Sequence, residues 1–153
     1  GIGTTGPGAK LDIQGTTGTT INLDNTGTGD ARFILDSGGT GARAWTIGSS
    51  GQDAAIVTAG YLFIRDSTSG NNRFVIDNNG NIGIGNTTPD TKLDITGTAS
   101  ASLYYAGDGA VGAPAYSFSQ DTNTGIYRGG TDILSFATGG SERYVLMPVV
   151  MLA

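Results

Sequence analysis

The sequence feature that most constrains this chain is an internal repeat. The segment from Gly1 to Gly15 aligns with the segment from Gly83 to Gly97 at an offset of 82 residues. The two segments share Gly-Ile-Gly at the start, a proline, Lys-Leu-Asp-Ile near the end and the final glycine. Repeated sequence indicates repeated structure, so we expect both segments to adopt the same local conformation.

A second motif recurs at half that offset, 41 residues. Arg32–Gly39 and Arg73–Gly80 share an arginine, a phenylalanine, an aspartate and the last glycine, and Arg143–Leu146 is a shorter version. We call the shared Arg-[Phe/Tyr]-[Ile/Val]-[Leu/Ile] sequence the Arg–aromatic motif. The repeats predict two modules: residues 1–82, and residues 83–153 with an apolar C-terminal segment.

The composition predicts an all-β fold. The chain has 27 glycines and only one glutamate, Glu142, which leaves too few helix-forming residues for a mainly helical protein. Short β-prone runs recur about every 8 to 15 residues between polar turns, as in all-β architectures. The clearest runs are 20–23, 32–35, 44–47, 54–57, 61–64, 73–76, 92–95, 102–105, 115–118, 132–136 and 143–147.

Glycine-containing pairs between these runs predict tight turns, because glycine and asparagine accept positive φ angles. The predicted turn pairs are Asn79-Gly80, Gly38-Gly39, Gly129-Gly130 and Gly139-Gly140.

Some of the runs are apolar on both faces, so both faces need cover. Without helices, that cover must come from other strands, and so we expect an elongated, interwoven trimeric β-fibre. We also expect residues 145–152 to pack against other chains, because an exposed apolar strand recruits further chains. The candidate oligomer-interface residues are Phe33, Leu35, Phe74, Ile76, Val145, Met147, Val149 and Leu152.

The segment Gly83–Ile95, with Ile82 before it, resembles a signature common in bacteriophage tail fibre proteins. In that family the signature follows an Arg-[Leu/Phe]-x-[Ile/Val]-Asp-x-x-Gly segment, and Arg73–Asn81 supplies it here. The stretch from Ala115 to Arg143 is also similar to a module of these fibres. The resemblance implies a homotrimer of interwoven strands. At the C-terminus, Met147–Ala153 replaces the turn that the family pattern would continue with.

From the resemblance we expect a structural fibre protein of a virion, a phage tail or capsid fibre that contributes to host attachment. Its expected partners are further copies of itself, other virion fibre or baseplate proteins, and a host-surface glycan. Its expected location is the virion surface. The alternative is a subunit of a bacterial extracellular filament or a surface adhesin, located at the cell surface.

We expect no enzymatic activity, no cofactor and no bound metal. The sequence has neither cysteine nor histidine, which excludes thiolate chemistry, catalytic triads and most zinc or haem sites. A net charge of -5 argues against nucleic acid as a partner, and no apolar run is long enough for membrane insertion.

Three weaker signals have simpler explanations. Gly1–Gly6 matches a dinucleotide fingerprint but lacks the strand and helix that the fingerprint requires. Asp77, Asn79 and Asn81 have the spacing of a calcium loop, but Ile82 replaces its glycine, so a hairpin turn is favoured. Calcium bound between the chains of a trimer stays open. The scattered aspartates are typical of turns rather than of a glycosidase carboxylate pair.

Six aromatic residues are candidates for contact with a glycan, because an aromatic ring suits the apolar face of a sugar. They are Trp45, Tyr61, Tyr104, Tyr105, Tyr116 and Tyr127, of which Trp45, Tyr104, Tyr105 and Tyr127 are preferred. Tyr104 and Tyr105 are adjacent, so in a strand they would point to opposite faces and one would be exposed. Tyr127 lies between Gly125 and Gly129, which predicts a loop. Trp45 lies in an apolar run, where packing between strands is the competing interpretation.

Overall fold

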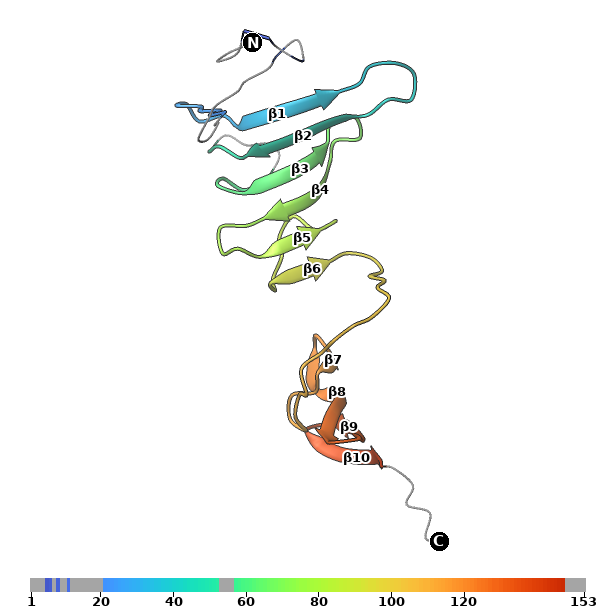
Figure 1. Ribbon diagram of the computed structural model, residues 1–153. Coiled ribbons are helices and arrows are strands. Elements are labelled where there is room, and N and C mark those ends of the chain that lie inside the picture. Colours follow the sequence, from blue (N-terminus) through green and yellow to red (C-terminus); the bar gives the residue numbers. More distant parts are fainter. Residues whose placement is uncertain (1–4, 7, 9–10, 12–20, 53–56, 148–153) are drawn as a thin grey trace. The chain divides into compact units, whose positions relative to one another are not determined.

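The computed structural model describes residues 5–6, 8, 11, 21–52 and 57–147 (Figure 1). These residues form ten strands and no helix, so the predicted all-β class is confirmed. The chain divides into two compact units, one up to Ala99 and one from Ser100 onward. We call them unit 1 and unit 2 and describe each by itself.

Unit 1 contains a six-stranded sheet in which the strands follow one another in sequence order. Neighbouring strands are antiparallel except for the last pair, which is parallel. The strands are β1 (Ala31–Asp36), β2 (Ala44–Ser49), β3 (Leu62–Asp66), β4 (Asn71–Ile76), β5 (Ile82–Ile84) and β6 (Leu93–Ile95).

The phage-fibre signature forms the parallel pair and its connection. Residues 85–92 connect β5 to β6, a short crossover for parallel strands, which usually need a dozen residues or more. The Asn86 side-chain amide donates to Asp94 at 2.8 Å, and Pro89 is buried. The sequence-repeat boundary at residues 82 and 83 falls within β5, whereas the contacts divide the chain after Ala99.

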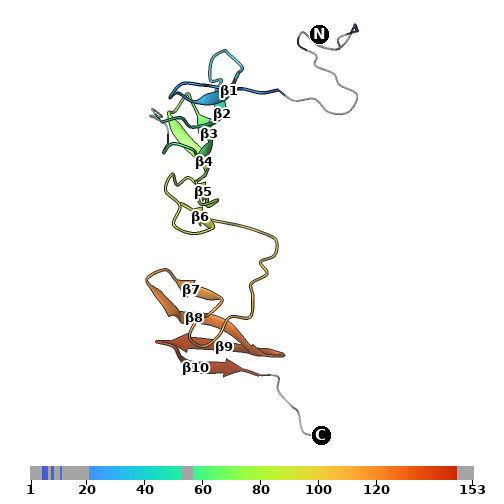
Figure 2. The same ribbon diagram turned by 90° about the vertical axis from the view of Figure 1, so that its left-hand side faces the viewer.

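Unit 2 contains a four-stranded antiparallel sheet, and Figure 2 shows its strands following one another in chain order. The strands are β7 (Tyr116–Phe118), β8 (Asp121–Gly130), β9 (Ile133–Thr138) and β10 (Ser141–Leu146). Gly139 and Gly140 both have positive φ angles, 57° and 70°, and form the predicted tight turn between β9 and β10.

Most predicted runs overlap observed strands, but several predictions are wrong. Residues 102–105 and the described part of 20–23 form no strand. Gly129-Gly130 is not a turn but the end of β8, and the chain reverses at Thr131-Asp132, where Asp132 has a φ of 59°. Residues 54–56 of another predicted run lie outside the described residues, as do nearly all of residues 1–15.

The hydrophobic core is thin. Among the described residues, the buried apolar side chains are Phe63 and Val75 in unit 1 and Tyr127 and Ala137 in unit 2. Many large apolar side chains remain exposed in both units. Their positions on the sheets define the surfaces described next.

Candidate functional site

Six large apolar side chains form one row across the whole unit 1 sheet. Each is the direct cross-strand partner of the next, and residues directly opposite in a sheet point to the same face. We call this set the unit 1 apolar row: Phe33, Ile47, Ile64, Phe74, Ile84 and Ile95. We call the face that bears it the open face.

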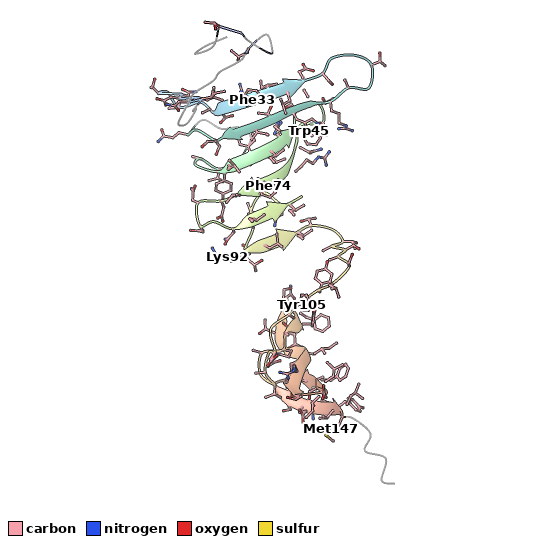
Figure 3. All side chains as sticks on the ribbon, in the orientation of Figure 1. Phe33, Trp45, Phe74, Lys92, Tyr105 and Met147 are labelled. Carbon is pink, nitrogen blue, oxygen red and sulfur yellow. The ribbon has the colours of Figure 1, made fainter. Side chains whose placement is uncertain are left out.

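The open face carries further apolar side chains beside this row. On one side, Leu62, Ile76, Ile82 and Leu93 are paired in the same way. On the other side, Leu35 pairs with the half-buried Trp45. Figure 3 labels three of the side chains on this sheet. Four predicted interface residues therefore share one face: Phe33, Leu35, Phe74 and Ile76.

Part of the opposite face of unit 1 is covered by the chain itself. Across it, Gly48 lies opposite Phe63, Phe63 opposite Val75, and Val75 opposite Gly83. A Cβ atom on Gly83 would lie only 2.1 Å from the main-chain oxygen of Asn86. The crossover between β5 and β6 therefore passes directly over this face, where Phe63 and Val75 are fully buried.

A buried carboxylate lies beside Trp45 on the open face. Asp66 is the cross-strand partner of Trp45 and accepts hydrogen bonds from Arg43, Arg73 and the main-chain N–H of Ser69. Its burial opposes ionisation, but the hydrogen bonds from Ser69 and Arg73 and the charge of Arg43 outweigh that cost and lower the pKa of Asp66. The Asp66 carboxylate is therefore held by two arginines and one main-chain N–H group, as a structural ion-pair cluster.

The residues with calcium-loop spacing form the turn between β4 and β5. The Asp77 carboxylate accepts hydrogen bonds from the main-chain N–H groups of Asn79 and Asn81 and from the Asn81 side chain. Burial would raise the pKa of Asp77, but these bonds and the charge of Lys92 lower it. Lys92 also donates to the Asn79 carbonyl at 2.7 Å. The hairpin interpretation of this motif is therefore confirmed.

Unit 2 has a shorter row of its own. The strand register places Tyr116, Ile126, Phe136 and Tyr144 side by side on one face. Above this unit 2 aromatic row lies a groove of about 730 Å³, whose lining also includes Arg143. Tyr116 is one of the aromatic residues that the sequence indicates for glycan contact, whereas Phe136 and Tyr144 are not predicted to bind a partner.

The structure corrects the expected environment of three aromatic residues. Tyr127 is buried in β8, not in a loop, and its hydroxyl donates to Glu142. This hydrogen bond and the burial of the ring raise the pKa of Tyr127. Tyr104 and Tyr105 lie outside any strand, and both are exposed, Tyr105 to 93%.

The C-terminal interface candidates lie in unit 2. Val145 is in β10 on the face opposite Tyr144, and Met147 follows that strand and is exposed. Val149 and Leu152 lie outside the described residues. The expectation for residues 145–152 therefore concerns a strand that is exposed along its whole described length.

The described residues offer no clear centre for chemistry. They contain no group of three or more acidic, histidine or cysteine side chains that could hold a metal ion. No helix among them is long and apolar enough to cross a membrane. Compared with known protein families and with curated proteins, the sequence gives no match. The arrangement is suited to packing against other surfaces.

Proposed function

We propose that this chain is a structural fibre protein of a virion, from a phage tail or capsid fibre, which contributes to host attachment. The observation that supports it best is the open face of unit 1. A bare apolar surface that spans six strands is unfavourable in water, and contiguous exposed patches of this kind typically mark interaction sites. The proposal also rests on the resemblance of Gly83–Ile95 to phage tail fibre sequences.

The partner proposed for the open face is the same face of two further copies. Three such faces around a common three-fold axis form a closed assembly. In it, Phe33, Ile47 and Ile84 would each lose water contact, and full burial of a large apolar side chain stabilises by about 1.5–3 kcal/mol relative to full exposure. The opposite face, part of which the crossover already covers, would face outward.

We favour a virion protein over a bacterial surface protein because of the sequence resemblance, which covers most of the chain. A bacterial extracellular filament or surface adhesin remains the second candidate, since the same bare sheet faces would serve it. The proposal includes no enzymatic activity. Surface placement, on the virion or on the cell, is common to both candidates.

Two neighbouring residues of β1 offer a matched test of the assembly. Phe33 is 53% exposed and lies on the open face, whereas Ile34 is 55% exposed and lies on the other face. We expect Phe33→Glu to reduce the mass measured by analytical ultracentrifugation from trimer to monomer, and Ile34→Glu to leave it unchanged. A wild-type monomer, or a Phe33→Glu variant that keeps its trimeric mass, would contradict the assembly.

Whether the protein belongs to a virion or to a cell-surface filament needs a separate measurement. Mass spectrometry of purified virions and of purified cell-surface filaments would locate the protein. We expect its peptides in the virion sample. Peptides found only in filaments from uninfected cells would establish the alternative, whatever the assembly state.

A further inference from the structure

The Arg–aromatic motif has the same local structure in both units. In β4, Phe74 pairs with Ile64 and Asn72 with Arg65, so Arg73 is the extra residue of a β-bulge. In β10, Tyr144 pairs with Phe136 and Glu142 with Ala137, so Arg143 is the extra residue. A bulge is a specific structural feature, and its recurrence at the same arginine makes β4 and β10 equivalent strands.

The two strands differ in what lies beyond them. The outer edge of β4 is paired with β5, with Ile84 opposite Phe74, Gly83 opposite Val75 and Ile82 opposite Ile76. With β5 and its crossover in place, Val75 is 0% exposed. The glycine is required, because a Cβ atom there would lie 2.9 Å from the Val75 side chain and 2.1 Å from the crossover.

The outer edge of β10 has no strand beside it among the described residues. Val145, the equivalent of Val75, is 37% exposed, and Tyr144, Leu146 and Met147 are more exposed still. An apolar strand with an open edge offers unpaired backbone groups to another chain. The edge of β10 is therefore an acceptor for a strand equivalent to β5.

The sequence contains a second segment of the β5–β6 type. Residues 1–15 repeat residues 83–97, which supply the last two residues of β5, the crossover and β6. We propose that residues 1–15 of a second molecule add to the edge of β10, so that molecules join end to end. By equivalence with β5, Ile2 would lie opposite Tyr144 and Gly1 opposite Val145.

This inference does not depend on the proposed virion function or on the trimer. The trimer uses the open face of unit 1, whereas the end-to-end joint uses a strand edge of unit 2. The joint reuses a contact that the chain already makes with itself between β4 and β5. A contact between different surfaces of two molecules continues into a filament unless rotation closes it.

Cysteine cross-linking tests the joint, because the natural sequence contains no cysteine. Gly85 donates to the Arg73 carbonyl and Asp77 to the Asn81 carbonyl, so the Phe74–Ile84 pair between them is a non-hydrogen-bonded pair, whose side chains lie close together. We therefore expect Ile2→Cys molecules mixed with Tyr144→Cys molecules to form a disulfide-linked pair under mild oxidation. Tyr144 is exposed, so its substitution should leave the fold intact.

Three controls sharpen the result. Phe74→Cys/Ile84→Cys in one chain should form the equivalent internal disulfide. Adding Gly1→Val to the Ile2→Cys chain should reduce cross-linking at least tenfold, because the added side chain meets Val145. A mixture of Ile2→Cys and Phe33→Cys molecules tests the Arg–aromatic motif of β1, the edge strand of the unit 1 sheet. These molecules should remain unlinked.

The double variant Ile2→Cys/Tyr144→Cys should give a ladder of linked molecules on a non-reducing gel. Internal closure within single chains would overturn the end-to-end joint, and so would preferential linkage to Phe33→Cys. Absence of any Ile2–Tyr144 linkage, while the Phe74–Ile84 control closes, would also overturn it. None of these outcomes depends on where the protein is located.

Discussion

Units 1 and 2 present the same short motif in two different surroundings. In β4 the motif is an interior strand and its valine, Val75, is fully buried. In β10 the motif is an edge strand and its valine, Val145, is exposed. The four residues of the motif are alike in the two strands, Arg-Phe-Val-Ile in β4 and Arg-Tyr-Val-Leu in β10, so the difference in burial follows from the next strand and its crossover.

The apolar rows of the two units differ in chemistry as well as in length. The unit 1 row consists only of isoleucine and phenylalanine, whereas the unit 2 row begins and ends with a tyrosine, Tyr116 and Tyr144. Tyrosine combines an apolar ring with a hydroxyl that can remain hydrated. Unit 1 is therefore suited to a dry interface, and the groove of unit 2 to a wetter one.

The largest expected effect is the loss of the unit 1 core. Phe63→Ala should lower the free energy of unfolding by about 3–5 kcal/mol, because it leaves a cavity at a fully buried position of the core. Trp45 is the only tryptophan, so its fluorescence during denaturation reports on unit 1. Ile34→Ala on the same face, but exposed, should change stability by about 0.5 kcal/mol or less. Equal effects of the two substitutions would show that Phe63 is not a core residue.

The positions of several strands could be predicted from the sequence, because they depend on local residue preferences. The β-prone runs Arg32–Leu35 and Arg73–Ile76 correctly indicated strands, and their apolar residues on both faces placed Phe33 and Phe74 among the interface candidates. The register that joins them into one row was not predictable, because it depends on the pairing of distant strands.

Other features were missed because their residues carry the opposite local signal. β8 is the longest strand among the described residues, but it is rich in glycine and threonine, which predicts a loop around Tyr127. The parallel pair β5–β6 depends on a crossover whose Asn-Thr-Thr-Pro-Asp sequence looks like a simple loop. Conversely, Tyr104-Tyr105 has strand-forming side chains but no neighbouring strand to pair with in the described structure.

The next effect compares the ion pairs of the two units. Asp66→Asn should destabilise unit 1, because it removes the charge that Arg43 and Arg73 contact. The loss should be smaller than for Phe63→Ala, since both arginines are half exposed and water screens them. Asp108→Asn in unit 2 should change little, because the Asp108–Arg128 pair is exposed on both sides. Denaturation curves of both variants at neutral pH would measure the difference.

The stability that Asp66 contributes to unit 1 should depend on pH with a definite sign. The folded state lowers the pKa of Asp66 below its ordinary value of 3.8, so the unfolded state takes up a proton first as the pH falls. Stability from Asp66 is therefore present above pH 3.8 and is lost progressively below it. We expect the wild-type unit 1 transition to weaken in this acid range and that of Asp66→Asn to weaken less. Parallel pH profiles would contradict the role of Asp66.

A pair of valine substitutions would test the contrast between β4 and β10 directly. Val75→Ala should cost about 2 kcal/mol, because it empties a buried position next to Gly83. Val145→Ala should cost a few tenths of a kcal/mol at low protein concentration. If a second molecule covers β10, the cost of Val145→Ala should increase with concentration, whereas the cost of Val75→Ala should not.

The smallest effect concerns how the two units turn their hairpins. The turn between β4 and β5 uses Gly80, with a φ of 71°, whereas the turn between β8 and β9 places Asp132 at 59°. A left-handed conformation costs most residues about 1 kcal/mol, although aspartate tolerates it better. Gly80→Ala should therefore destabilise unit 1 by about 1 kcal/mol.

Asp132→Gly should stabilise unit 2 by a few tenths of a kcal/mol, because the relief of strain exceeds the added flexibility of the unfolded chain. The melting temperatures of Gly80→Ala and Asp132→Gly should therefore move in opposite directions. Gly112→Ala is the control, because a Cβ atom on Gly112 would meet no other atom. A destabilised Asp132→Gly protein would mean that the aspartate makes a contribution to the turn beyond its backbone angle.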